Sequence, residues 1–332
     1  MLVLGVETSC DDTAAAVLLD GRTVLANLVA SQDTVHGPFG GVVPELASRQ
    51  HIRHILPILD GALRKAGVAL TDLDGIAVTR GPGLVGSLLV GLSVVKGISF
   101  RWRIPYIGVN HLEAHLLAIF LEQDVRFPYL ALLASGGHTL LCLVRDFGEY
   151  LHLGGTRDDA AGEAFDKVAK MMGLGYPGGR VIDQLAKRGN PKAIAFPRAR
   201  LKKGSYDFSF SGIKTAVWQY LKARGKEGWE RERSDIAGSF QEAVVDMLVA
   251  PTLRAARELK VGRIVLGGGV AANSCLRERM LEKAQEKGIE VFFPTPALCS
   301  DNGAMVALGG TYWLNRGNRD DFRLNVDADL TL

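Results

Sequence analysis

The chain has 332 residues, of which 47% are hydrophobic and 23% charged, and its formal net charge is +3. Its length exceeds one comfortable hydrophobic core, so two domains of roughly 150 residues each are expected. The composition excludes disordered and fibrous classes. The small net charge excludes a uniformly basic nucleic-acid-binding surface, so any contact with nucleic acid is expected to be local.

The four cysteines lie far apart in the sequence and form no CxxC pair. This spacing argues against a zinc knuckle and a disulfide scaffold, and it fits a reducing compartment. Glu7 comes too early for a signal peptide, and the longest weakly polar stretch, 82–95, is shorter than the ~20 residues that cross a membrane. We expect a cytoplasmic protein with no membrane partner.

Two segments, 2–19 and 129–144, share one plan: an apolar strand, a short turn of small and polar residues, and a second apolar strand. The turns are 7–13 and 135–139. Small residues between two strands let backbone N–H groups approach a phosphate closely. The sequence therefore predicts a phosphate-binding hairpin that occurs twice.

A second pattern follows each hairpin: a strand, a glycine turn and a helix, at 75–95 and again from 263. This duplication predicts an α/β fold of two similar lobes that face each other across a ligand cleft. Ile104-Pro105 interrupts an apolar helix pattern and suggests a boundary near residue 108. The expected lobes are 1–108, with the tail 318–332 as a candidate addition, and 109–317.

Glycines at 81, 83 and 86 match the dinucleotide-binding pattern GxGxxG between a strand and a helix. That pattern should be followed about 20 residues later by an acid, and residues 98–110 contain none. We therefore reject a dinucleotide fold, and we expect these glycines to serve tight helix packing or a close approach to the ligand cleft. The later glycine turn ends at Asn273, whose side chain could bond a ribose or a phosphate or serve the turn alone.

The segment His111-Leu112-Glu113-Ala114-His115 places two imidazoles at positions i and i+4, on one face of a helix, where both can bind one metal ion. At about 100° per residue, Glu113 lies roughly 200° round from His111 and points away. The order HxExH thus differs from the HExxH of zinc peptidases. The pair needs a third ligand, and an exposed or core histidine pair is the alternative.

Asp301 is the best third ligand, in a loop that follows a strand and leads into a helix. Its alternative role is the N-cap of that helix. Two imidazoles and one carboxylate leave open positions that suit Fe(II), and Zn is the other candidate. Mg alone would be unusual with two imidazoles, although it stays among the candidates.

Residues 158–170 predict a helix that starts with Asp158 and Asp159, whose charges suit the helix dipole. Asp166 and Asp183 lie beyond that first turn and could bond the ribose hydroxyls of a nucleotide. Basic and aromatic residues alternate between 198 and 214, a pattern that suits single-stranded RNA or a solvated loop anchored by its aromatics. The basic candidates are Arg198, Arg200, Lys202, Lys203 and Lys214.

Taken together, these motifs resemble one family, the tRNA N6-adenosine threonylcarbamoyltransferases of the actin/Hsp70/sugar-kinase (ASKHA) superfamily, over nearly the whole chain. The form of the second turn is that of bacterial members. The motifs that carry the resemblance are residues 5–11 (GVETSCD), 40–49 (GGVVPELASR), 81–84 (GPGL), 111–115 (HLEAH), 135–139 (SGGHT) and 207–212 (DFSFSG).

The resemblance implies transfer of a threonylcarbamoyl group from threonylcarbamoyl-AMP to N6 of the adenine 3′ of the anticodon in tRNAs that read codons starting with A, with release of AMP. It implies His111, His115 and Asp301 as metal ligands and Asp11 as a catalytic residue. Asp12 stands where relatives often have Glu. The implied contacts to the adenylate are Ser135, Gly136, Gly137, His138, Thr139, Asp166, Gly179, Asp183 and Asn273.

The chemistry agrees with this assignment, because an adenine amine is a weak nucleophile and its acyl donor must be activated. The implied protein partners are a shorter, TsaB-like paralogue and a small, TsaE-like ATPase. Three alternatives stay open: a small-molecule kinase of the same superfamily, a metallopeptidase, and a non-catalytic scaffold. A kinase has no need of two imidazoles, and the direction of Glu113 argues against a peptidase.

Overall fold

The apolar strands at the start of the chain form a hairpin in the computed structural model, which describes residues 1–199, 201–202 and 204–332. Arg200 and Lys203, two of the predicted RNA contacts, lie outside the described residues. The chain divides into two compact units. The first is Met1–Val125 with Ser300–Leu332, and the second is Arg126–Cys299.

A five-stranded sheet organises the first unit, in the order β3-β2-β1-β4-β5. The first three strands are antiparallel neighbours, whereas β4 runs parallel to β1 and β5 runs parallel to β4. A parallel pair needs a crossover, which a helix supplies between β4 and β5. The strands are β1 (Leu2–Glu7), β2 (Asp12–Leu19), β3 (Thr23–Ser31), β4 (Gly75–Gly81) and β5 (Tyr106–Asn110).

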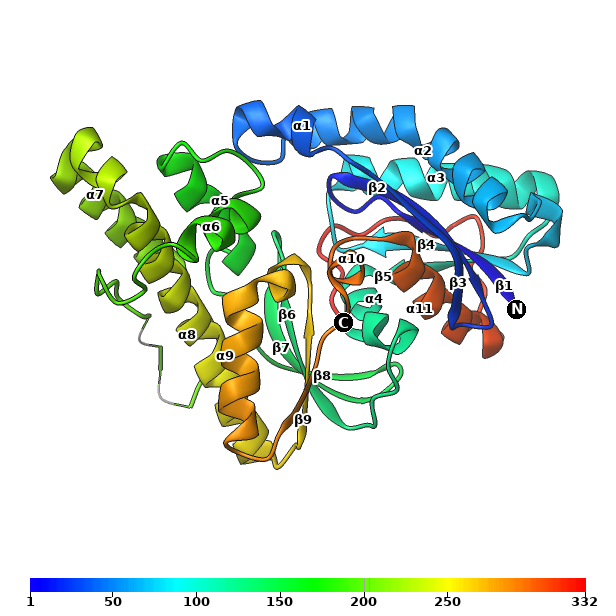
Figure 1. The fold of residues 1–332 in the computed structure, drawn as a ribbon. Coiled ribbons are helices and arrows are strands. Elements are labelled where there is room, and N and C mark those ends of the chain that lie inside the picture. Colours follow the sequence, from blue (N-terminus) through cyan, green and yellow to red (C-terminus); the bar gives the residue numbers. More distant parts are fainter. Residues whose placement is uncertain (200, 203) are drawn as a thin grey trace. The chain divides into compact units, whose positions relative to one another are not determined.

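Helices cover both faces of this sheet (Figure 1). Leu4 and Val6 join Ile55 and Leu59 in one core, on the face where two long helices pack. The alternate residue Gly5 faces the last helix on the other side. The α-helices of this unit are α1 (Asp33–His36), α2 (Pro44–Ala66), α3 (Val85–Trp102), α4 (His111–Leu117) and α11 (Gly303–Asn315), and short 3-10 turns span Gly37–Phe39, Leu70–Asp72 and Ala118–Leu121.

The helix α11 lies unusually close to the sheet because small residues line the contact. A Cβ atom on Gly5 would stand 2.1 Å from the carbonyl oxygen of Gly303, and one on Gly310 would stand 2.2 Å from the Cβ of Ala77. Real side chains never approach so closely, so these glycines permit the packing. The loop that precedes α11, including Asp301, is thereby held against the first sheet.

The second unit repeats this plan with a sheet of order β10-β9-β6-β7-β8. Its antiparallel strands β6, β7 and β8 and its parallel neighbours β9 and β10 match the first sheet strand for strand. Phe165, Phe208, Phe210 and Phe240 lie in its core. The elements are β6 (Tyr129–Ala134), β7 (Thr139–Asp146), β8 (Glu149–Gly155), α5 (Ala161–Met171), α6 (Gly178–Ala186), α7 (Ser211–Arg231), α8 (Arg233–Leu259), β9 (Arg263–Gly267), a 3-10 turn (Gly269–Ala272), α9 (Ser274–Gln285), β10 (Glu290–Phe292) and α10 (Pro296–Cys299).

The matching sheets confirm the predicted α/β duplication, but the division of the chain differs from the expected lobes 1–108 and 109–317. The expected boundary falls inside β5, an edge strand of the first sheet, and α4 follows it and packs against α11. The tail 318–332 also belongs to the first unit: the amides of Asp320 and Asp327 donate to the carbonyls of Tyr106 and Arg80, each at 2.9 Å.

The helix α3 is, among the described residues, the one long and apolar enough to cross a membrane by length and composition. In the fold it packs along α2 and β4, and Leu88, Leu92 and Val95 are buried. Residues 158 and 159 do not start a helix, because α5 begins at Ala161. The carboxylate of Asp158 instead accepts hydrogen bonds from the amides of Phe210 and Ser211, at the start of α7.

Candidate functional site

The two histidines of the HxExH segment lie on α4, which begins directly after β5. Asn110 caps this helix, because its side-chain oxygen accepts a hydrogen bond from the amide of Leu112 at 2.8 Å. His111 and His115 are both buried, and their ring centroids are 4.7 Å apart. The predicted helical spacing therefore places both imidazoles on one side of α4.

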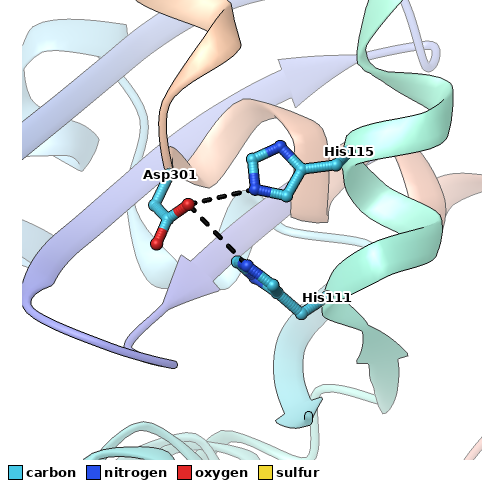
Figure 2. Close-up of side chains that lie close together, drawn as sticks. All are labelled: His111, His115 and Asp301. Carbon is cyan, nitrogen blue, oxygen red and sulfur yellow. Dashed lines mark hydrogen bonds and ion pairs between the residues drawn. The ribbon is translucent and has the colours of Figure 1, made fainter. Parts of the chain in front are cut away.

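Asp301 faces this pair from the loop before α11 (Figure 2). Its Oδ1 atom lies 3.0 Å from Nε2 of His115 and 3.7 Å from Nε2 of His111. Asp301 is not the N-cap of α11, because Asn302 has that role and accepts from the amide of Met305. One ligand atom from each of the three residues lies within 4.8 Å of the others, so the group could hold one metal ion.

A buried carboxylate supports His111 from behind. Glu7 lies at the end of β1, and its Oε2 atom is 3.1 Å from Nδ1 of His111. The same carboxylate accepts hydrogen bonds from the hydroxyl of Thr79 and the amide of Ser9. A carboxylate on one ring nitrogen fixes the orientation of the ring, so Glu7 directs Nε2 of His111 towards Asp301.

The electrostatics of this group favour a bound cation. Burial alone would lower the pKa of His111, but the charges of Glu7 and Asp301 outweigh burial and raise it to about 9. Nδ1 of His115 is buried and has no hydrogen-bond partner among the described residues. Two carboxylates around two imidazoles thus attract positive charge to the place where the Nε2 atoms converge.

Glu113 takes no part in this group. Its carboxylate is buried and accepts a hydrogen bond from the indole N–H of Trp313 at 3.1 Å. The helix therefore turns Glu113 away from the imidazoles, as the spacing predicts. Glu113 therefore cannot serve as the base that the HExxH helix of a zinc peptidase supplies.

The loop between β1 and β2 brings two further carboxylates into the first unit. Burial raises the pKa of Asp11, and the negative charge of Asp301 adds to the effect. Burial likewise raises the pKa of Asp12 to about 8, with contributions from Asp301 and Asp11. Asp12 therefore keeps its proton at neutral pH in the metal-free chain, whereas Asp11 is a stronger base than an ordinary aspartate.

His51 on α2 holds this loop in place. Its Nε2 atom donates to the carbonyl of Cys10 at 3.0 Å, and its Nδ1 atom lies 2.8 Å from the hydroxyl of Thr13, which therefore donates to it. Both ring nitrogens are thus used, and burial lowers the pKa of His51. The neutral, buried imidazole of His51 is thus hydrogen-bonded to Cys10 and Thr13, the residues directly before Asp11 and directly after Asp12.

In the second unit, the turn between β6 and β7 forms a closed loop. The amide of Ser135 donates to the carbonyl of His138 at 2.7 Å, and the amide of His138 donates back to the hydroxyl of Ser135 at 3.0 Å. A Cβ atom on Gly136 or Gly137 would meet nothing within 4 Å. The loop thus presents open backbone, as a phosphate-binding turn requires.

The start of α5 is joined to this loop. The amide of Gly162 donates to the carbonyl of Ser135 at 3.0 Å, and the amide of Ala161 donates to the hydroxyl of Thr139 at 2.8 Å. A Cβ atom on Gly162 would stand 2.6 Å from the oxygen of Ser135. Helix and loop can therefore pack this closely only with glycine at 162.

Two of the other predicted adenylate contacts, Asp166 and Asp183, are each hydrogen-bonded to the chain neighbour of a further predicted contact. Asp166 accepts from the amide of Gly178, next to Gly179, at 2.7 Å, and Asp183 accepts from the hydroxyl of Ser274, next to Asn273, at 2.8 Å. The Asn273 side chain caps α9 and donates to Gln241, so it has a structural role at this turn.

The predicted RNA contacts are less available than the sequence suggests. Arg198 forms an ion pair with Asp246 at 2.7 Å, and Lys214 is paired with Asp159. Lys202 is exposed. An internal ion pair neutralises a cation that would otherwise attract phosphate, so this segment offers a weaker electrostatic surface than its composition indicates.

Comparison with known proteins places the chain in a family. The family model described as tRNA N6-adenosine threonylcarbamoyltransferase matches residues 23–308. A relative with that name from Syntrophotalea carbinolica is 56% identical over 332 residues, which are 100% of this chain and 97% of the relative. Another from Geobacter metallireducens is 54% identical over 99% of this chain and 96% of its own length. The chain belongs to the tRNA N6-adenosine threonylcarbamoyltransferase family.

Solved structures share the fold of this family member. Component A of the (R)-2-hydroxyglutaryl-CoA dehydratase of Acidaminococcus fermentans has a TM-score of 0.56 at 16% identity and covers 94% of this chain and 98% of its own. Full-length HypF, solved in a phosphate- and nucleotide-bound form, has a TM-score of 0.63 at 14% identity and covers 95% of this chain and 55% of its own. These likenesses confirm the predicted actin/Hsp70-like α/β class.

Two residues of this threonylcarbamoyltransferase-family chain received no role in the motif analysis, Glu7 and His51. Each carries a signal that could have revealed it. Glu7 is an acid at the end of an apolar strand, and His51 occupies the apolar face of α2 that also includes Ala47, Ile55 and Leu59. A polar group on a buried face must have partners, because an unpaired one costs stability.

Proposed function

We propose that this protein transfers the threonylcarbamoyl group from threonylcarbamoyl-AMP to N6 of the adenine 3′ of the anticodon in tRNAs that read codons starting with A, and releases AMP. The observation that carries the proposal is the 56% identity over the whole chain to a relative named for this transfer. The grouping of His111, His115 and Asp301 and the open glycine loop support it.

We further infer that His111, His115 and Asp301 bind one divalent metal ion, Fe(II) in preference to Zn or Mg. Two imidazoles and one carboxylate suit Fe(II) or Zn better than Mg, which prefers oxygen ligands. When bound, such an ion polarises a carbonyl or phosphoryl oxygen as a Lewis acid. Glu7 holds the ring of His111 in the orientation that this ligand set needs.

The reaction needs a proton acceptor and a holder for the leaving group. The adenine amine forms a bond to the carbonyl carbon of the threonylcarbamoyl group, the bond from that carbon to the phosphate oxygen breaks, and AMP leaves. Asp11, whose pKa is raised by burial, accepts the proton of the amine. The amides of Gly136 and Gly137 hold the phosphate of AMP.

The remaining adenylate contacts lie in the same unit as this loop. Asp166, Gly179 and Asp183 lie on α5 and α6, near the turn that ends at Asn273. Carboxylates in this position bond the hydroxyls of the ribose. The partners of the reaction are tRNA, the adenylate, a TsaB-like paralogue and a TsaE-like ATPase, all in the cytoplasm.

The deciding experiment is the transfer of labelled threonine into unmodified tRNA, with carbonate, ATP, the adenylate-forming enzyme and both helper proteins. We expect label at the adenine 3′ of the anticodon with the wild-type chain, and loss of transfer when His111 and His115 are both replaced by Ala. Glu113→Gln, which alters a buried carboxylate on the same helix, serves as the control and should retain activity. Absence of label with the wild-type chain would refute the proposed function, and full activity of the double variant would refute the metal assignment.

A further inference from the structure

A groove on the second unit combines exposed tryptophan with positive charge. Its volume is about 370 Å³, and it is lined by Met171, Trp218, Leu221, Lys222 and Trp229. Trp218 is 49% exposed and Met171 is 37% exposed. Large apolar side chains seldom stay this open beside one another without a partner.

The shape of the groove comes from a bend in α7, the yellow-green helix of Figure 1. Gly225 interrupts the helix with a φ of 67° and a ψ of 165°, in a region that favours glycine. Trp218, Leu221 and Lys222 precede the bend, whereas Trp229 follows it. The bend thus lets two tryptophans from one segment line the same groove.

Cations lie over the rings of both tryptophans. Nζ of Lys222 is 5.1 Å from the ring centroid of Trp218, and the guanidinium carbon of Arg233 is 6.0 Å from that of Trp229. Residues 211–233 contain six basic and three acidic residues. Lys214 is paired with Asp159 outside this segment, so an excess of two positive charges is left beside the groove.

We propose that the groove lined by Trp218, Lys222 and Trp229 binds unstacked bases of the tRNA anticodon loop. This inference rests on the proposed function. Aromatic faces bind single-stranded bases by stacking, and neighbouring cations bind the phosphates that join them. An apolar segment of a protein partner would pack against the tryptophans, but it would supply no negative charge to the neighbouring cations.

The position of the groove within its unit fits the same ligand. Met171 is the last residue of α5, and the first turn of α5 is bonded to the Ser135 loop through Gly162. A helix of 11 residues is roughly 15 Å long, so the groove lies about one short helix away from the proposed adenylate loop. Bases that flank the modified adenine could reach it.

The test measures binding of an unmodified tRNA transcript, and of its isolated anticodon stem-loop, by the full chain. Trp218→Ala should weaken the Kd for both RNAs by roughly 5- to 150-fold, the range expected for loss of one stacked base. Lys222→Glu should also weaken binding and reduce the slope of log Kd against log salt by about 1. Trp102→Ala is the matched control, because Trp102 lies at the end of α3 and is 44% exposed.

The Kd values of Trp102→Ala should stay within about twofold of those of the wild type. Thermal melting checks that each variant is folded. Unchanged Kd values in both Trp218→Ala and Lys222→Glu would overturn the proposal, as would a loss confined to binding of a helper protein. Transfer by the wild-type chain is measured in parallel. An active wild type with unaffected variants refutes the groove alone, whereas an inactive wild type refutes the proposed function.

Discussion

Glu7 orients the imidazole ring of His111, although Glu7 is not itself one of the proposed metal ligands. The carboxylate is fully buried and is held by Thr79 and Ser9 as well as by His111. We predict that Glu7→Gln weakens metal binding by about 10- to 100-fold, because the amide no longer fixes the imidazole as strongly. Anaerobic titration with Fe(II), or competition for Zn with a coloured chelator, measures this affinity.

Glu113→Gln is the matched control for that experiment, since Glu113 is an equally buried carboxylate that binds Trp313 instead. It should leave the metal affinity unchanged. Equal affinities of the Glu7→Gln variant and the wild type would show that Glu7 has no part in orienting the ligand.

Asp12 gives the chain a pH dependence with a definite sign. Its pKa rises from 3.8 to about 8 on folding, so the folded chain keeps this proton over a pH range in which the unfolded chain has lost it. The free energy of unfolding of the metal-free protein should therefore decrease as pH rises from about 4 to about 8. Asp12→Asn should reduce this decrease, as measured by urea unfolding of chelator-treated protein at several pH values. Identical pH profiles for the two proteins would contradict the prediction.

At the scale of the elements, the contact between α5 and the Ser135 loop depends on a missing side chain. Gly162→Ala would place a methyl group 2.6 Å from the carbonyl oxygen of Ser135 and 2.8 Å from Cα of Gly136. Backbone atoms cannot yield cheaply, so we predict both lower stability and weaker binding of AMP, measured by melting and by calorimetric titration.

Gly97→Ala is the matched helical control, because a Cβ atom there meets nothing within 4 Å. Its higher helix propensity should raise the free energy of unfolding by up to about 1 kcal/mol and leave AMP binding unchanged. If Gly162→Ala binds AMP as strongly as the wild type does, the Ser135 loop has no part in binding the adenylate.

The elements themselves were largely predictable, because strand and helix patterns are local. Two apolar strands around a short turn of small and polar residues indicated each hairpin, and the helix that carries His111 and His115 follows from their spacing. The prediction of where α5 starts was wrong. Asp158 was expected in its first turn, but it instead binds the start of α7, 52 residues further along the chain. A sequence pattern cannot show which helix N-terminus an acid will reach.

At the scale of the whole molecule, all three proposed metal ligands belong to the first unit. A metal that binds only the folded state stabilises it by about 2.7 kcal/mol at 100 times its Kd. We predict that metal removal increases hydrogen exchange in residues 1–125 and 300–332 more than in residues 126–299. Mass spectrometry with and without a chelator tests this, and the His111→Ala, His115→Ala double variant should show no difference. An equal loss of protection in both units would contradict the assignment.

Short spacings along the chain were enough to predict the repeated strand plan, the imidazole pair on one helix face, the direction of Glu113 away from that pair, and the family through its motifs. The remaining features depend on how distant segments pack together. Asp301 lies 186 residues from His115, and it reaches the pair because glycines let α11 pack closely on the first sheet. The role of Glu7, the true division of the chain and the ion pairs that neutralise Arg198 and Lys214 are also long-range. Such contacts follow from how elements pack, which local periodicity does not contain.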